Sequence, residues 1–495
     1  MATTGSDPTV ARTLLVVVVV AIALRAAAAW LTIDIPGDGP SRAGIAYRWS
    51  LSPKLIRSGV WLPGFTYLAG SVCMLIPNPR IAPRLLNVIL GSASIPLLYV
   101  VTRRLYGNAV GLSAAALLAI LPLHVGLSAS SLTEAGLVFG MLAVLCTAYG
   151  AAEARWPWSI LSAAGLVLFA VFIEMIRYEA WLLLPAVVAY VAYRRRSLVI
   201  GLALAIVLSV FPVLWTMGNH SQAGNALLGF SAAVTDVENG TPASPFMAVR
   251  LLWRTLRAYL GPLAALLMCL GGGAAAIRVV RRETSAEEML HIALAAIAWA
   301  LVFGLILQRG QTVWGRLYIL AIVLTLPLAA AWIGRRVADG RMRGAVVAAC
   351  LVFTATAYAT YQPTIFVTSR RPTEIAELIV WRDGSIYRSD AVLLTRMNWE
   401  ATYLPHYSPD LSGHTIIVSS LEGDAIIGEF IRGQQPGLLV TRPEDVELLP
   451  RVERLLGGAI GPQHLVKTIG TLQVFDIRHL TRTAPPGPDG AAPPR

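Results

Sequence analysis

Residues 13–33, TLLVVVVVAIALRAAAAWLTI, are the first of a series of long apolar runs that decide the fold class. About 20 consecutive apolar residues let a helix cross the hydrocarbon core of a bilayer. The whole chain of 495 residues is 56% hydrophobic and 14% charged, whereas soluble domains carry about 25% charged residues. This composition excludes a soluble globular enzyme, and uninterrupted apolar runs exclude a β-barrel, whose strands alternate. The sequence therefore predicts a polytopic α-helical membrane protein.

Positive charge orients the predicted spans. Residues 1–361 contain 27 Lys and Arg against 13 Asp and Glu, and residues 362–495 contain 13 against 15, so the net charge of +12 arises in the membrane part and does not call for nucleic acid. Arginine clusters such as Arg103-Arg104 follow apolar runs, as is typical of cytoplasmic ends. With the N-terminus inside and the region after residue 361 outside, we predict eleven spans: 13–33, 81–101, 110–126, 135–151, 158–176, 180–193, 198–215, 256–277, 288–307, 316–334 and 344–361.

We predict that the chain divides into a membrane domain, residues 1–361, and an extracytoplasmic α/β domain, residues 362–483. The first outer loop, 34–80, contains a further apolar segment, 61–76, that would place the later arginine clusters outside if it crossed, so we predict that it does not cross. The α/β domain is indicated by a helical stretch, Thr373 to Trp381, and by β-like runs at 391–395, 414–419, 437–441 and 472–477. The Pro- and Gly-rich tail, 484–495, is predicted to be disordered.

Ionisable residues near bilayer depth are costly unless they are paired or face a wet cavity, so each is a candidate functional residue. Arginine binds phosphate oxygens in a fork, and a carboxylate can accept a proton. The predicted topology brings such residues to the outer face from four parts of the chain, as a site for a phosphate-bearing lipid and a hydroxyl acceptor requires. They are Arg25, Asp34, Asp38, Glu134, Glu174, Arg177, Glu179 and Arg316.

Each candidate also has a structural interpretation. Arg177 with its neighbours Glu174 and Glu179 could form an ion pair that only anchors a tight turn. Arg316 could be an interfacial anchor, and His124 could be a hydrogen-bonded core histidine. Asp34 and Asp38 could be solvated turn residues, because Pro and Gly beside them favour Asp on local grounds.

Five stretches carry a resemblance to a known family. They are DIPGDGPSRAGIAY (34–47), WLPGFTYLAG (61–70), LPLHVGLSASSLTE (121–134), RYEAWLLLP (177–185) and GRLYILAIVLTLPLAA (315–330). In order and topology they resemble the GT-C glycosyltransferases, especially the bacterial protein-mannosyltransferase-like and aminoarabinose-transferase-like members. An outer α/β tail is also usual in that family.

The resemblance implies transfer of a sugar, hexose or pentose, from a polyprenyl-phosphate carrier to a hydroxyl acceptor at the outer face of the cytoplasmic membrane, with inversion. It implies Asp38 as general base, with Asp34 as the alternative. The residues expected around the donor phosphate and substrate are Arg177, Arg316, Glu134, Glu179, Arg25, Tyr318 and His124. In the common form of the family a second acid follows the loop acid, but Gly39 stands there. We therefore expect no metal and no cofactor.

Two other classes compete with this interpretation. A transporter or flippase for a lipid-linked sugar would also use many spans, but such folds often contain inverted repeats, and no repeat is visible here. An oligosaccharide polymerase or ligase would place a large outer loop between late spans and would lack the α/β tail. The expected partners are the lipid donor, the bilayer and an acceptor that is a glycan, a protein or a lipid, without nucleic acid.

Overall fold

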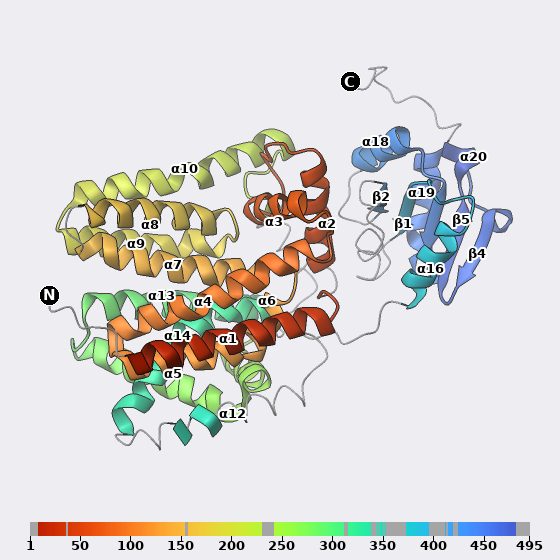
Figure 1. Ribbon diagram of the computed structural model, residues 1–495. Helices are drawn as coiled ribbons and strands as arrows, with labels where there is room; N and C mark the ends of the chain where they lie inside the picture. The colour runs from red at the N-terminus through yellow and green to blue at the C-terminus, as the bar shows by residue number, and fades with distance from the viewer. Residues whose placement is uncertain are drawn as a thin grey trace. The chain divides into compact units, whose positions relative to one another are not determined.

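The computed structural model contains two compact units, which are described separately (Figure 1). The first comprises Met1–Thr32, Pro53–Ala69 and Pro83–Val367, and the second comprises Ile33–Ser52, Gly70–Ala82 and Thr368–Arg495. The structure describes residues 8–35, 38–153, 157–229, 242–310, 315–337, 344–345, 347–349, 352, 373–395, 411, 414–418 and 424–481.

The first unit is built of helices. Their bounds are α1 Pro8–Leu31, α4 Ala82–Tyr106, α5 Asn108–Ile120, α6 Pro122–Ser128, α7 Glu134–Glu153, α8 Trp158–Glu174, α9 Glu179–Arg195, α10 Leu198–Ala223, α12 Pro245–Val280, α13 Ala286–Arg309, the 3-10 turn η1 Gly315–Tyr318 and α14 Ile319–Arg336. Helix α3, Gly64–Leu75, begins in the first unit and ends in the second. It has 12 residues, about 18 Å at 1.5 Å per residue, which is shorter than the hydrocarbon core.

Within the described residues, seven helices are long and apolar enough to cross a membrane, and the pair α5 and α6, bent by 60°, would make an eighth. Helices α8 and α9 have 17 residues each, at the lower limit for a span. The polytopic helical fold is therefore confirmed, and a helix lies at each of the first ten predicted spans. The eleventh, 344–361, falls mostly outside the described residues.

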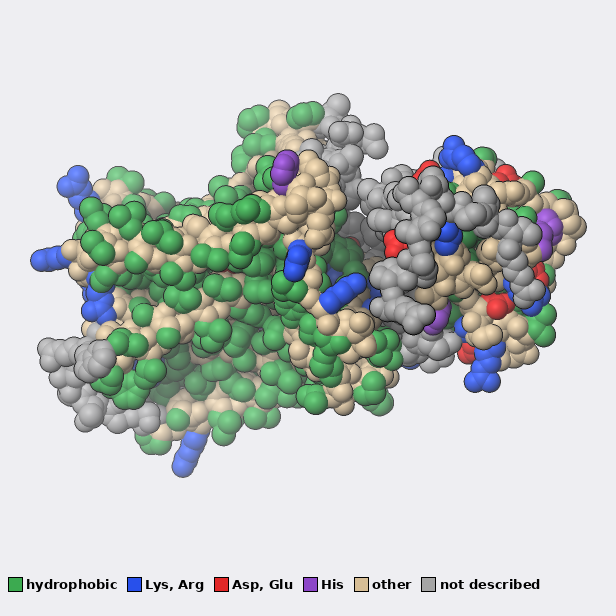
Figure 2. Space-filling model, turned by 90° about the horizontal axis from the view of Figure 1, so that it is seen from above, with side chains coloured by type: hydrophobic (Ala, Val, Ile, Leu, Met, Phe, Trp, Pro, Cys, Tyr) green, Lys and Arg blue, Asp and Glu red, His purple; other side chains and the backbone are tan. Residues whose placement is uncertain are grey.

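The burial of the helices shows which of them form the centre of the first unit. In the most apolar 18-residue stretch of η1 and α14, 83% of the residues are buried. In the corresponding stretches of α1 and of α10, only 17% are buried. Hydrophobic side chains cover most of the face of this unit in Figure 2. Apolar side chains that face outward are stable in lipid, so this pattern is the one expected of a helix bundle within a bilayer.

The second unit contains a five-stranded sheet in the order β2-β1-β3-β5-β4. Strand β1 is parallel to β2 and β3, and β5 is antiparallel to β3 and β4. The strands are β1 Val392–Thr395, β2 Thr415–Val418, β3 Leu438–Thr441, β4 Leu465–Ile469 and β5 Leu472–Asp476. Around the sheet lie α16 Thr373–Asp383, α18 Asp424–Gln434, η5 Pro443–Leu448, α19 Leu449–Leu456, η6 Pro462–His464 and α20 Arg478–Thr481.

Alternating strand residues build two hydrophobic cores, one on each face of the sheet. One core joins the sheet to α16 through Leu378, and the other joins it to α18 and α19 through Ile427 and Val452. The helix and four of the strands match the predicted segments, whereas β4 was not predicted. Ile33, which follows α1 in the sequence, packs against the α16 core. The second unit thus includes part of the first outer loop, with α2, Asp38–Leu51.

Candidate active site

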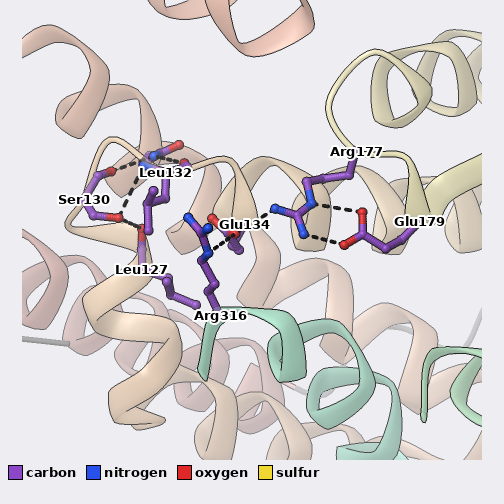
Figure 3. Close-up of polar contacts among 8 residues, drawn as sticks. Leu127, Ser130, Leu132, Glu134, Arg177, Glu179 and Arg316 are labelled. Carbon is purple, nitrogen blue, oxygen red and sulfur yellow. Dashed lines mark hydrogen bonds and ion pairs between the residues drawn. The ribbon is translucent and has the colours of Figure 1, made fainter. Parts of the chain in front are cut away.

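Four of the predicted site residues meet in one ion-pair cluster within the first unit (Figure 3). Glu134 is the first residue of α7, Arg177 lies in the turn between α8 and α9, Glu179 begins α9, and Arg316 lies in η1. Segments far apart in the sequence therefore supply two arginines and two carboxylates to the same place. We call these four residues the arginine–glutamate cluster.

Arg177 is held from two sides. Its Nε donates to Glu179 Oε2 at 3.0 Å and its Nη2 donates to Glu179 Oε1, so the pair is bidentate. Its Nη1 donates to Glu134 Oε1 at 3.0 Å. Glu174, the other predicted neighbour, makes no side-chain ion pair or hydrogen bond with any described residue. A guanidinium with both a fork and a third contact is fixed in position.

Arg316 makes a longer contact with Glu134 than Arg177 does. Its Nε lies 4.0 Å from Glu134 Oε1, and a quarter of its side chain is exposed. In Figure 3, Glu134 lies between Arg316 and Arg177. The formal charges of the two arginines and the two glutamates cancel, so the cluster carries no net charge. An anionic ligand would therefore have to share the arginines with the carboxylates. Arg316 has the longer contact and the greater exposure, and it is therefore the better candidate for an anionic ligand.

One carboxylate oxygen of Glu134 can still accept a hydrogen bond. Its side chain is 1% exposed, and its Oε2 makes no hydrogen bond within the described structure. The hydroxyl Oγ1 of the neighbouring Thr133 is likewise buried without a partner there. Buried polar atoms are nearly always paired with protein, water or ligand, so this end of α7 can accept a hydrogen bond from a ligand.

Glycine at position 315 allows η1 to pack closely against α12. A Cβ atom there would lie 2.3 Å from the ring of Tyr259. Tyr318, at the end of the same turn, is fully buried, with its ring centroid 6.3 Å from that of Tyr259 and 6.5 Å from that of Trp299. Tyr318 thus packs beneath the turn that presents Arg316.

Two residues of α4 hold the turn that leads into Glu134. Asn87 is fully buried, and its Nδ2 donates to the carbonyls of Ser130 and Leu132, at 2.6 Å each. Arg84 Nε donates to the carbonyl of Ala129, also at 2.6 Å. The sequence analysis did not identify either residue. The amide of Asn87 inside the apolar run 81–101 was a usable signal, because an unpaired amide is costly to place in a membrane, as a charged side chain is.

Arg25 and His124 lie at the break between α5 and α6. Pro122 has no N–H, so the carbonyl of Leu118 lacks its helical donor. The fully buried Arg25 supplies one through Nη2 at 3.2 Å, and its Nη1 donates to the carbonyl of Ala119 at 2.9 Å. Nη2 also lies 2.6 Å from His124 Nδ1. Substrate binding by these two residues stays a prediction, and the geometry favours a structural role.

Asp34 and Asp38 belong to the second unit. Asp34 is 1% exposed, and its Oδ1 accepts a hydrogen bond from the backbone N–H of Ile35 at 2.9 Å. Asp38 is the first residue of α2 and is partly exposed. A Cβ atom on Gly39 would lie 2.6 Å from Asp34 Oδ1. The position where the resembling family carries a second acid must therefore be glycine here, because the Asp34 carboxylate fills the space.

Among the described residues, no group of three or more His, Cys, Asp or Glu side chains could hold a metal ion.

The turn between α8 and α9 carries Tyr178, whose phenol is neutral. Burial raises the pKa of Tyr178, and the hydrogen bond from Trp215 Nε1 at 3.0 Å only partly opposes this shift. Its hydroxyl donates to the carbonyl of Val60 at 3.2 Å, which ties the first outer loop to α9.

Comparisons with known proteins bear on the family and the fold. Residues 62–216 match the family model for dolichyl-phosphate-mannose-protein mannosyltransferase. No curated protein matches the sequence. The matched region therefore runs from α3 into α10 and includes Glu134, Arg177 and Glu179.

Solved structures match nearly the whole chain. The crystal structure of ArnT from Cupriavidus metallidurans bound to undecaprenyl phosphate has 14% identity and a TM-score of 0.65, covering 98% of this chain and 100% of that one. The oligosaccharyltransferase of Archaeoglobus fulgidus, in its apo form, has 11% identity and a TM-score of 0.57, covering 92% and 72%. Arabinofuranosyltransferase AftD from Mycobacteria has 13% identity and a TM-score of 0.51, covering 94% and 41%. The chain thus has the GT-C fold, and the resemblance noted in the sequence is confirmed at the level of the fold.

Proposed function

We propose that this multi-pass membrane protein with the GT-C fold transfers a sugar from a polyprenyl-phosphate carrier to a hydroxyl acceptor at the outer face of the cytoplasmic membrane. The arginine–glutamate cluster is the observation that carries the proposal, because two arginines at the ends of buried helices can bind a lipid phosphate. The matched mannosyltransferase model and the ArnT structure with its bound undecaprenyl phosphate support a donor of this class.

In the proposed reaction, Arg316 binds the carrier phosphate and Arg177 is the fixed second cation. The acceptor oxygen attacks the anomeric carbon while the bond from that carbon to the phosphate oxygen breaks, so the configuration inverts. The acceptor proton passes to the Asp38 carboxylate, and the carrier leaves as a phosphate monoester whose added charge the arginines stabilise. No covalent enzyme intermediate and no metal are needed in this scheme.

Asp38 is preferred to Asp34 as the base because it is the more exposed of the two, whereas the Asp34 carboxylate is buried against Gly39 and already accepts a backbone hydrogen bond. Asp38→Asn keeps the size of the side chain and removes the proton acceptor. We expect this variant to insert and to bind undecaprenyl phosphate as the wild type does, but to lose at least ~10²-fold in turnover. Asp34→Asn is expected to be milder.

The test uses the full chain in nanodiscs with undecaprenyl-phosphate-linked hexoses and pentoses, and it follows the release of free undecaprenyl phosphate. Full activity in Asp38→Asn and loss in Asp34→Asn would move the base to Asp34, and activity in both would remove this loop from the chemistry. Donor movement across vesicles without release of undecaprenyl phosphate would instead support a flippase. A reporter fused after residue 361 should be active only outside the cytoplasm if the proposed orientation holds.

A further inference from the structure

We propose that the first half of α12, residues 245–260, lies on the bilayer surface and binds anionic phospholipid headgroups through Arg250, Arg254 and Arg257. We call these three side chains the arginine stripe. The proposal does not depend on the enzymatic activity, because it concerns the contact between the protein and the surrounding bilayer.

A break separates this half of α12 from the apolar span that follows. Gly261 has φ 75° and ψ 159°, outside the helical region, and Pro262 comes next. A positive φ is readily adopted only by glycine, and proline cannot donate to the preceding turn. The two halves can therefore take different directions, one across the membrane and the other along its surface.

The spacing of the three arginines, four and then three residues, places them on one face of the helix. All three are exposed, whereas Ala248, Leu256 and Leu260 are buried. At 100° per residue these buried side chains fall outside the arc of the stripe. The helix thus packs against the rest of the first unit and turns its basic face away from it.

The stripe has no acidic partner in the part of the chain that the structure describes. The Arg257 guanidinium lies over the ring of Trp253, 6.0 Å from its centroid. Large apolar side chains border the stripe: Phe246 is 80% exposed and Met247 is 43% exposed. Unpaired cations beside exposed aromatic and aliphatic groups are typical of a helix that lies at the headgroup level.

The stripe lies on the helix that supports the candidate site. Tyr259, two residues beyond Arg257, packs over Gly315 and so next to Arg316 in η1. A headgroup contact along the stripe would therefore hold η1 at the depth where lipid phosphates lie. The occupant to which we commit is the bilayer phospholipid, because the stripe faces outward and not toward the arginine–glutamate cluster.

The test reconstitutes the full chain in nanodiscs of phosphatidylcholine with increasing phosphatidylglycerol and counts retained phosphatidylglycerol by native mass spectrometry. The variant R250Q/R254Q/R257Q should bind phosphatidylglycerol at least ~10-fold more weakly at low salt, since a basic residue near an anionic surface contributes about fivefold. The matched control is R388Q/R432Q/R454Q, which removes three exposed arginines of the second unit and should leave retention unchanged.

Two further measurements make the outcome decisive. Lysine at all three stripe positions should preserve retention, because a charged surface attracts either cation. Hydrogen exchange in residues 245–260 should slow as the phosphatidylglycerol fraction rises in the wild type and not in the glutamine variant. Equal retention in wild type and glutamine variant would overturn the proposal. So would selective loss of undecaprenyl phosphate with phosphatidylglycerol unaffected, which would make the stripe a donor subsite.

Discussion

At the scale of single residues, the two arginines of the cluster have different surroundings and so different expected roles. Arg177 makes a bidentate pair with Glu179 and a third contact with the buried Glu134. Arg316 has its contact with Glu134 at 4.0 Å and greater exposure. From the sequence, both were expected to bind phosphate in the same way. The geometry separates a positioning arginine from one that can reach a ligand.

We therefore expect Arg177→Gln to reduce stability, because it leaves Glu134 buried without its nearest cation. Breaking a buried pair from one side costs about 3–5 kcal/mol, and Glu134→Gln in the same chain should restore part of the lost stability.

Arg316→Gln should keep the unfolding temperature but weaken binding of undecaprenyl phosphate by ~10–100-fold, as loss of a charged hydrogen bond does. Thermal unfolding and a binding titration check both. An unchanged unfolding temperature in Arg177→Gln, with unchanged affinity in Arg316→Gln, would contradict the two roles.

At the scale of elements, α4 controls the turn that carries Glu134. Asn87 donates to two buried carbonyls of this turn, and no other described residue donates to either of them. A side chain that satisfies both carbonyls also fixes the direction in which α7 begins. Asn87 is thus a positioning residue for Glu134.

This role predicts coupling between Asn87 and Glu134. Asn87→Leu removes the donors at similar volume, and its effect on kcat/KM should be far from additive with that of Glu134→Gln, with a coupling of about 0.5–3 kcal/mol. Ser94→Ala on the same helix is the control, because the Ser94 hydroxyl donates to the carbonyl of Leu90 in its own helix. Additive effects would mean that Asn87 contributes only general stability.

The end of β5 carries a hydrogen-bonded carboxylate, that of Asp476. Asp476 accepts from the Arg478 side chain at 2.6 Å and from the Tyr387 hydroxyl at 3.0 Å. Partial burial alone would raise the pKa of Asp476, but the hydrogen bonds from the Arg478 side chain and backbone and from Tyr387 outweigh it, so the pKa is lowered. In the unfolded chain this carboxyl titrates near ~3.9. Its contribution to stability is therefore full above that pH and is lost as the pH falls through the lower folded pKa.

Asp476→Asn should consequently speed hydrogen exchange of β5 amides at pH 7, after correction for the intrinsic rate. The difference from wild type should begin to shrink below about pH 4, where the carboxyl of the unfolded chain takes up a proton, and should disappear once the pH falls below the lower pKa of the folded wild type. Asp424→Asn is the control, since Asp424 is half exposed and pairs with Arg451 at the surface, where ion pairs contribute little. A difference that stays constant from pH 7 to pH 3 would show that the charge of Asp476 is irrelevant.

At the scale of the whole molecule, the chain does not divide where its composition changes. The second unit joins Ile33–Ser52 to the C-terminal sheet domain, although more than 300 residues separate them in sequence. Ile33 packs against the same core as Ile375 and Leu438. The C-terminal domain therefore supports the segment that carries Asp34 and Asp38.

Ile33→Ser should weaken that support. We expect faster hydrogen exchange both in residues 38–51 and in β1, because the two share one core, together with lower transfer activity. Ile35→Ser, two residues further along and outside this core cluster, is the matched control and should leave β1 unchanged. Faster exchange confined to residues 38–51 would mean that the loop and the C-terminal domain are independent.

The sequence by itself determined the elements. Apolar runs of membrane length, arginine clusters at their ends and short β-branched runs are local signals, and within the described residues helices or strands lie where they predicted them, from residues 13–33 to residues 472–477. The predicted span 344–361 lies mostly outside those residues. Only the tertiary structure decided the pairing of the side chains. Arg177 binds Glu134, 43 residues away, and Arg25 donates to carbonyls of α5 more than 90 residues away. Hydropathy reports how a segment partitions between water and lipid, whereas such pairing depends on how separate helices pack, which no local pattern contains.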